Sequence, residues 1–137
     1  MNTVHIPRVV MAGTNSGVGT TTIVAGLLAA YANGGRTVQS FNVGPDYIDP
    51  GFHKIASQRE CYNLDTWLVP PHKLIPFFVG QAETADISII EGVMGLYDGG
   101  REGVSSTAQV AKDLKAPVVL VIDCKAMGES AAAIAKG

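Results

Sequence analysis

Short apolar segments recur along this chain at intervals that suit strands separated by helices. Four segments are rich in β-branched and other apolar residues, which is typical of buried strands: 8–12, 37–43, 86–90 and 118–123. The last of these, VVLVID after Pro117, is the clearest, since five of its residues are continuously apolar. Continuously apolar strands of this kind favour a parallel sheet that is covered on both faces.

Helical segments are expected between and after these strands, at 23–32, 52–57, 70–81, 107–115 and in about two turns beyond 123. In the first of them Val24, Leu28 and Tyr31 share one helical face, and Asn33-Gly34-Gly35 ends it, because glycine accepts the left-handed conformation. Pro70 or Pro71 begins the third, since proline suits a first helical position. The alternation predicts an α/β fold: a parallel sheet with helices on both faces.

Length and patterning together predict one incomplete domain. The 137 residues contain no internal repeat and no linker that would divide the chain. Four strands make a small open sheet, and its edge strand would expose unpaired backbone groups unless another element covers it. We therefore expect a truncated domain, with a homodimer or a partner chain as the possible cover for that edge.

Composition and charge exclude several classes of protein. Hydrophobic residues make up 47% and charged residues 16%, which excludes a disordered chain and a coiled coil. The net charge of −2 gives no general attraction to nucleic acid or to an anionic membrane. The start of the chain lacks the pattern of a signal peptide, and the apolar run 23–32 is too short to span a membrane. We expect a cytoplasmic protein with neither nucleic acid nor membrane as its partner.

A glycine- and threonine-rich loop, residues 13–22, follows the first strand and leads into the first helix; we refer to it as the phosphate loop. Its glycines let successive backbone N–H groups point at an anion, and the start of the helix adds positive potential. Compared with the phosphate-loop pattern G-x-x-x-x-G-K-[ST], Gly19 and Thr21 fit, whereas Thr20 replaces the lysine. The residues expected to bind a nucleotide are Gly13, Asn15, Gly17, Val18, Gly19, Thr20, Thr21 and Thr22. The alternative is a simple turn that binds no ligand.

Acidic residues follow two further strands and reach the same edge of the sheet. Asp46 and Asp49 lie after the second strand, Glu91 ends the third and Asp98 follows it. Ligands in open α/β sheets bind beyond the carboxyl ends of the strands, and carboxylates beside phosphates hold Mg²⁺. The alternatives are turn-forming aspartates and a solvated strand end. The convergence of three polar loops favours a binding site.

The histidines and cysteines do not add a second chemistry. His5, His53 and His72 stand singly, with no spacing that suggests a metal site. Cys61 and Cys124 have no histidine near them in the sequence that would activate a thiolate. We interpret all five as structural residues.

Several motifs resemble one family of enzymes across nearly the whole chain. They are GTNSGVG with TTT after it, VGPDYIDPGFH, NLDTW, IIEGVMGLYDG and PVVLVID. The sequence is similar to the ATP-dependent cobyrinic acid a,c-diamide synthases, which are glutamine-using amidoligases of corrin biosynthesis. The phosphate loop is also shared with dethiobiotin synthetase and with partition ATPases, whereas the second and fourth motifs are specific to the synthases and their close relatives.

This resemblance implies a mechanism and a set of roles. ATP would phosphorylate a carboxylate of a corrin-type tetrapyrrole, and ammonia from glutamine would displace the phosphate to leave an amide. Carried over by motif, the phosphate loop would hold ATP, and Thr21, Asp46 and Glu91 would bind Mg²⁺. Tyr47 and Asp98, with Asp46, would lie near the reacting carboxylate as catalytic residues. Residues 1–137 would form part of an ATP-binding synthetase domain with a P-loop-type parallel sheet, similar to dethiobiotin synthetase, without the family's C-terminal glutaminase domain.

Two residues depart from the family pattern in a way that affects charge. The pattern has lysine in GVGKTT and in FKVGPDY, where this chain has Thr20 and Asn42. We therefore expect a fragment with impaired activity. The alternative is a non-catalytic module that binds nucleotide weakly or not at all. A partition-type ATPase is disfavoured, because that class carries another lysine early in the loop, where this chain has Thr14-Asn15.

Restoring both lysines tests whether their loss limits the site. We expect Thr20→Lys combined with Asn42→Lys to raise nucleotide affinity at least tenfold, because a hydrogen bond to a charged group contributes about 1.5–3 kcal/mol. Calorimetric titration with Mg²⁺ and ATP measures this. Equal affinity in the double variant and the unaltered chain would show that the missing lysines are not what limits binding.

Overall fold

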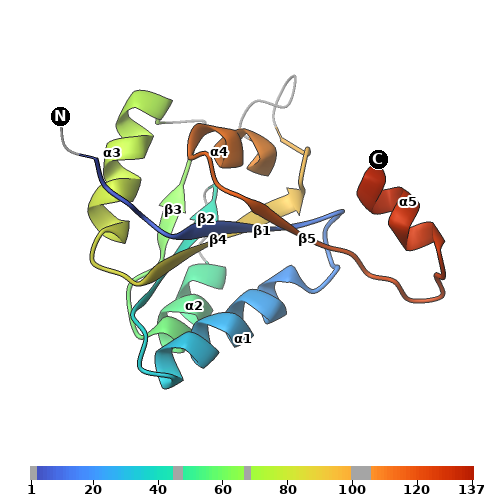
Figure 1. Cartoon of the computed structure of the whole chain (residues 1–137), viewed down its shortest axis with the longest axis horizontal. Helices are drawn as coiled ribbons and strands as arrows, with labels where there is room; N and C mark the ends of the chain where they lie inside the picture. Colours follow the sequence, from blue (N-terminus) through green and yellow to red (C-terminus); the bar gives the residue numbers. More distant parts are fainter. Residues whose placement is uncertain (1–2, 45–47, 67–68, 100–105) are drawn as a thin grey trace.

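The computed structural model describes residues 3–44, 48–66, 69–99 and 106–137, which form one parallel sheet flanked by helices (Figure 1). Five strands lie in the order β3-β2-β4-β1-β5. Their bounds are β1 Arg8–Gly13, β2 Val38–Val43, β3 Tyr62–Leu64, β4 Ile87–Gly95 and β5 Val118–Val121. The helices are α1 Thr20–Asn33, α2 Asp49–Ser57, α3 Pro71–Ala82, α4 Thr107–Asp113 and α5 Ser130–Lys136. The predicted α/β class is confirmed.

Alternate residues of each strand supply two separate cores. In β4, Ile90 packs on the α3 and α4 side, whereas its neighbour Ile89 packs on the α1 side. In the same way Val10 and Met11 of β1 face opposite cores. Figure 1 shows α3 and α4 on one face of the sheet and α1 and α2 on the other. This two-sided burial explains why the strands are continuously apolar.

The expectation of four strands is wrong by one. Residues Tyr62–Leu64 form β3, which pairs in parallel with β2 from Phe41 to Val43. A run of three residues is too short to show a strand pattern, and only its pairing with β2 makes it one. Helix α2 also begins earlier than expected, at Asp49, with Pro50 in its first turn.

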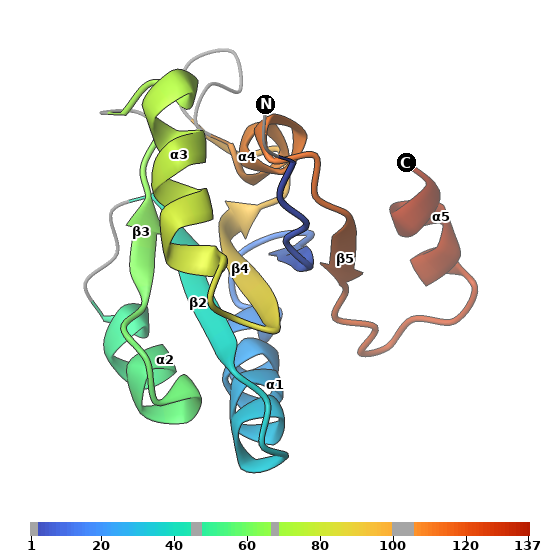
Figure 2. The same cartoon turned by 60° about the vertical axis from the view of Figure 1, so that its left-hand side comes forward.

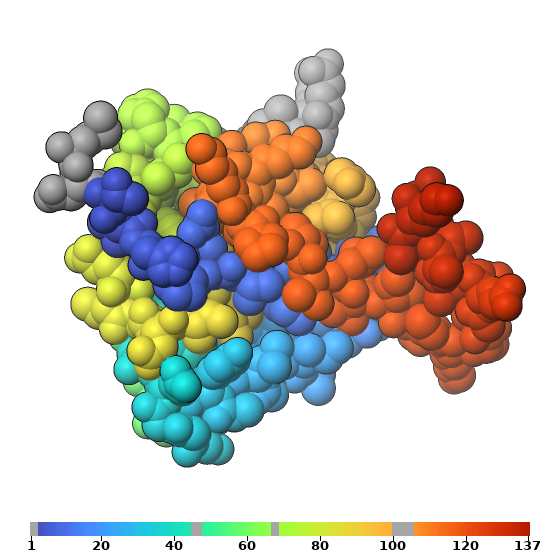
Figure 3. All heavy atoms as spheres, in the orientation of Figure 1, coloured from blue at the N-terminus to red at the C-terminus, as the bar shows by residue number. Residues whose placement is uncertain are grey.

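At the opposite edge of the sheet, no further strand among the described residues pairs with β5. Val118 and Val119 of β5 are 38% and 46% exposed, and α5 contains no buried residue. The segment after β5 stands away from the sheet (Figure 2), and the space-filling view shows it projecting from the body of the molecule (Figure 3). A cover for this edge stays a prediction. No helix within the described ranges is long and apolar enough to cross a membrane.

A bulge in β4 places the loop after it against the phosphate loop. β1 and β4 pair regularly up to Met11 and Glu91, and the next partners are Gly13 and Gly95, so β4 contains two extra residues there. Within the bulge Met94 adopts a left-handed conformation (φ 53°). Beyond it the Leu96 N–H donates to the Gly13 carbonyl at 2.9 Å. The start of the phosphate loop is therefore fixed by the end of β4.

Gly95 tests this connection, because a side chain has no room there. A Cβ atom at Gly95 would lie 2.6 Å from Asp98 Oδ2 and 2.7 Å from the Thr14 carbonyl oxygen. We expect Gly95→Ala to lower the free energy of unfolding by about 1–3 kcal/mol, since overpacking forces the two loops apart. Urea unfolding measures the change.

The matched control is Gly26→Ala in α1, where a Cβ atom would meet nothing within 4 Å. That substitution should stabilise the chain by about 0.5–1 kcal/mol, because alanine is the better helix residue. A Gly95→Ala protein as stable as the unaltered chain would mean that the two loops separate freely and that their contact does not position the site.

Candidate functional site

The phosphate loop has the backbone geometry of an anion-binding turn. It connects the buried end of β1 to α1, and Gly17 and Gly19 adopt φ values of 80° and 96° that only glycine takes without strain. Gly19 is the N-cap of α1, no side chain caps that end, and the first turn contains no acidic residue. The N–H groups of this turn and the positive end of the helix dipole therefore remain available to a phosphate.

The loop opens onto a cleft of about 380 Å³ at the carboxyl ends of the strands. Its lining comes from Asn15, Ser16, Gly17, Gly19, Thr20 and Thr21 in the loop, from Asn42 and Val43 in β2, from Asp49 in α2 and from Gly92, Val93 and Met94 in β4. The segments that follow three different strands thus contribute to one cavity. This is the convergence that the sequence predicted from the order of its polar loops.

Three residues of the predicted nucleotide set do not line the cleft. Gly13 lies below it, and a Cβ atom there would be 2.7 Å from Val18 Cγ2 and 2.9 Å from the Asn15 carbonyl oxygen. Gly13 and Val18 therefore support the shape of the loop from beneath. Thr22 is exposed on the first turn of α1.

The described part of the lining contains no lysine and no arginine. Both positions where the sequence departs from its family pattern, Thr20 and Asn42, lie on this cleft. The two changes therefore act on the same cavity, although they are 22 positions apart in the sequence. Any anion bound here meets backbone N–H groups, hydroxyls and an amide in place of two ammonium groups.

Asp49 lies beside the threonine at the start of α1. The Thr21 hydroxyl is 3.3 Å from Asp49 Oδ2, an interaction that joins the first turn of α1 to the first residue of α2. The sequence identified Asp49 as a loop carboxylate but did not choose it as a metal ligand. Asp49 is the carboxylate that the described part of the lining places beside the phosphate loop.

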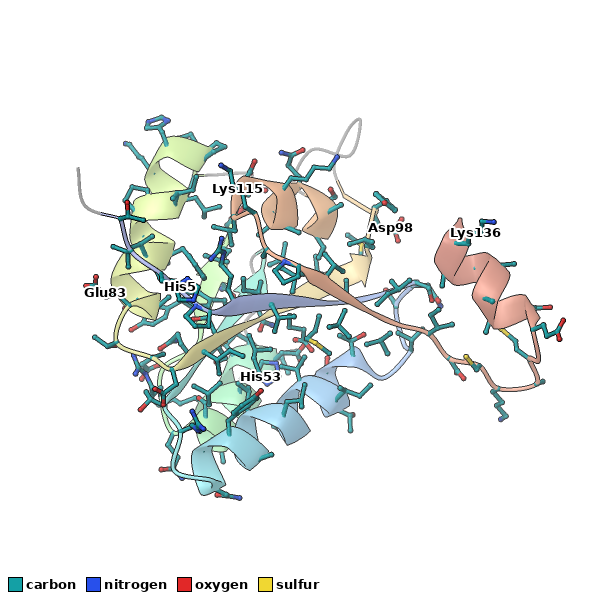
Figure 4. All side chains as sticks on the ribbon, in the orientation of Figure 1. His5, His53, Glu83, Asp98, Lys115 and Lys136 are labelled. Carbon is teal, nitrogen blue, oxygen red and sulfur yellow. The ribbon has the colours of Figure 1, made fainter. Side chains whose placement is uncertain are left out.

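Another acidic residue, Glu91, is not part of the described lining of the cleft and is buried in a polar cluster between the sheet and α2. His53 Nε2 lies 3.0 Å from Glu91 Oε2, and Asn42 Nδ2 donates to the same oxygen at 3.2 Å. Figure 4 shows His53 between α2 and the strands. Interpreting His53 as an isolated structural residue missed this contact. Its spacing of four from Asp49, one helical turn, could have signalled that both side chains face the site.

The remaining predicted catalytic residues divide into two groups. Asp46 and Tyr47 lie outside the described residues. Asp98 is exposed beyond the end of β4 (Figure 4), and its Oδ2 accepts a hydrogen bond from the Gly95 N–H at 2.9 Å. In this arrangement Asp98 holds the turn after β4.

The acidic residues suit a magnesium ion that shares its ligands with a nucleotide. Thr21, Asp49 and Glu91 supply hard oxygen atoms, and Glu91 Oε1 is buried with no hydrogen-bond partner among the described residues. The described ranges contain no group of three or more His, Cys, Asp or Glu that could hold a metal on its own. Mg²⁺ usually takes only one or two carboxylates and completes its shell with water and phosphate oxygens, so these residues fit it.

Curated proteins with related sequences share one kind of name. A hydrogenobyrinate a,c-diamide synthase of Streptomyces coelicolor is 49% identical over 96% of this chain. Cobyrinate a,c-diamide synthases of Picrophilus torridus and Dehalococcoides mccartyi strain CBDB1 are 48% and 46% identical over 96% and 97% of it. The chain spans 28–30% of the length of these three relatives. The predicted resemblance to the a,c-diamide synthases is confirmed.

Two further comparisons concern the fold and the domain. The signal recognition particle receptor FtsY of Elizabethkingia anophelis, solved in complex with GDP, superposes with a TM-score of 0.66. It is 20% identical, and the match covers 99% of this chain and 46% of that one, so it supports the fold alone. A family model described as "CobQ/CobB/MinD/ParA nucleotide binding domain" matches residues 9–137. This chain therefore belongs to the CobQ/CobB/MinD/ParA family of nucleotide-binding domains.

Proposed function

We propose that this chain is the ATP-binding part of an amidoligase that converts side-chain carboxylates of a corrin-type tetrapyrrole to amides. The names of relatives at 46–49% identity support the substrate class. The observation that carries the proposal is the cleft itself, where an anion-binding loop meets the carboxylate of Asp49 and where Asn42 of the lining contacts the buried Glu91. Such a site suits a nucleoside triphosphate with its metal ion.

The reaction would proceed in two steps. A carboxylate oxygen of the tetrapyrrole attacks the γ-phosphorus of ATP, ADP leaves, and an acyl phosphate forms. Ammonia released from glutamine then attacks the acyl carbon, and inorganic phosphate leaves as the amide forms. Phosphoryl transfer depends mainly on positioning and on neutralising charge, so the residues of the cleft need to do little covalent chemistry.

Each part of the cleft has a role in this proposal. The N–H groups of Gly17, Gly19 and the first turn of α1 bind the phosphates and orient the γ-phosphorus. Thr21, Asp49 and Glu91, together with Asp46 as the family motifs imply, would hold Mg²⁺, which neutralises negative charge on the phosphates when it is bound. Asp46, Tyr47 and Asp98 are proposed to lie near the tetrapyrrole carboxylate, as the family motifs imply.

The absence of lysine from the described lining favours a second candidate, a non-catalytic domain. Each charged hydrogen bond lost from a phosphate site weakens binding by roughly 10- to 100-fold, given about 1.5–3 kcal/mol for such a bond. Losing a donor that acts in the transition state slows the reaction by about 10²–10³. With Thr20 and Asn42 both changed, a chain that keeps the fold but no longer uses ATP is the alternative.

A calorimetric titration of the chain with ATP in Mg²⁺ distinguishes the two. We expect saturable binding at up to millimolar nucleotide, and at least tenfold weaker binding in Glu91→Gln, because the amide is a poorer magnesium ligand than a carboxylate. In EDTA the variant should bind no more weakly than the unaltered chain, since Glu91 would strengthen binding through the metal and its negative charge repels the free nucleotide.

The control is Glu60→Gln, which removes an acidic side chain that is 58% exposed and paired with Lys54. Its affinity should match that of the unaltered chain. A folded chain that gives no heat with millimolar ATP in Mg²⁺ supports the non-catalytic domain. Binding that is normal in Glu91→Gln contradicts the role given to that carboxylate.

A further inference from the structure

Asn42, His53 and Glu91 form a buried polar cluster beneath the cleft, in which two side chains contact the Glu91 carboxylate. Asn42 comes from β2, His53 from α2 and Glu91 from β4, and their exposed fractions are 3%, 0% and 2%. A carboxylate buried this deeply is costly unless it accepts hydrogen bonds or meets a cation. Here two donors from different elements reach it, so the sheet and α2 jointly determine where it points.

Both donors reach the same oxygen of Glu91. His53 Nε2 lies 3.0 Å from Oε2 and Asn42 Nδ2 lies 3.2 Å from it, whereas the equally buried Oε1 has no partner among the described residues. The last torsion of a glutamate side chain is broad, so an unrestrained carboxylate would exchange its two oxygens. Two donors on one oxygen fix that torsion and leave the other oxygen free for a ligand.

The direction of each hydrogen bond follows from its neighbours. The Cys61 thiol donates to Asn42 Oδ1 at 3.6 Å. This contact orients the Asn42 amide so that its Nδ2 faces Glu91. His53 Nδ1 is buried and has no hydrogen-bond partner within the described ranges. Because an unpaired N–H costs more than an unpaired lone pair, we place the ring hydrogen on Nε2, where it donates to Glu91 Oε2.

We propose that His53 is the positioning residue of Glu91: its Nε2–H holds Oε2 and thereby presents Oε1 to the metal ion of a bound nucleotide. This rests on the proposed function, which gives Glu91 its magnesium. His53 acts from α2, the helix that carries Asp49 one turn earlier. One helix therefore supplies a carboxylate of its own and the donor that orients the second.

The test measures ATP affinity of the whole chain over a range of Mg²⁺ concentrations. We expect His53→Leu to raise the Mg²⁺ concentration for half-maximal binding by about 10- to 100-fold, the usual effect of losing a group that orients a metal ligand. Affinity in EDTA should be unchanged. His53→Gln keeps an N–H donor and should restore at least part of the loss.

Lys54→Ala is the matched control, since Lys54 is the next residue of α2 but is exposed and pairs with Glu60 instead. Its Mg²⁺ dependence should equal that of the unaltered chain. A merely structural role for His53 predicts equal weakening with and without Mg²⁺ and no recovery in His53→Gln. Either that result or a normal Mg²⁺ dependence in His53→Leu overturns the proposal.

Nitrogen NMR of the His53 ring keeps this inference separate from the proposed function. If the unaltered chain binds no ATP, the proposed function fails, and the ring spectrum then decides the inference. If His53→Leu does not fold, the ring spectrum of the unaltered chain again tests the proposal. A single Nε2–H form whose resonance shifts in Glu91→Gln supports the proposal. A ring that exchanges between its two tautomers in the unaltered chain excludes a fixed bond to Glu91 and refutes it.

Discussion

β4 pairs with β1 on one side and with β2 on the other, so Glu91 has Met11 and Asn42 as its cross-strand neighbours. Because all three strands are parallel, their carboxyl ends lie together, and the phosphate loop, the start of α2 and the bulge of β4 meet at one edge. Moving β4 by one residue would turn Glu91 toward the opposite core. The register of this central strand therefore determines the composition of the cleft.

This register places the Glu91 carboxylate in an otherwise apolar core, and neighbouring polar residues offset the cost of burying it. Val24 and Leu28 of α1 fill the core on this face, whereas His53 of α2 meets Glu91. Removing a donor from a buried polar group commonly costs about 1–3 kcal/mol, and more when that group is charged. The contact between His53 and Glu91 both stabilises the fold and orients a candidate metal ligand. The two roles can therefore be separated only by measuring how nucleotide binding depends on Mg²⁺.

Much of the fold follows from local patterns, and the site follows in part. Four strands, the phosphate loop and Glu91 were predictable because β-branched runs and glycines act within a few residues of the chain. β3 was not, since a three-residue strand exists only through pairing with β2, and the contact of His53 with Glu91 was not, since it forms only when α2 packs on the sheet. Contacts between distant segments leave no periodic signal in a single sequence.

The two missing lysines have a consequence for how the cleft would hold a nucleotide. With Thr20 and Asn42 on its walls, the described lining offers phosphate only neutral donors, beside the carboxylate of Asp49 and above that of Glu91. Adding a triphosphate to these carboxylates brings like charges together, which disfavours binding of the free anion. A metal ion between them reverses the sign of that interaction. Nucleotide binding by this chain should therefore depend on Mg²⁺ more strictly than in a domain that keeps both lysines, and the orientation of Glu91 becomes correspondingly more important.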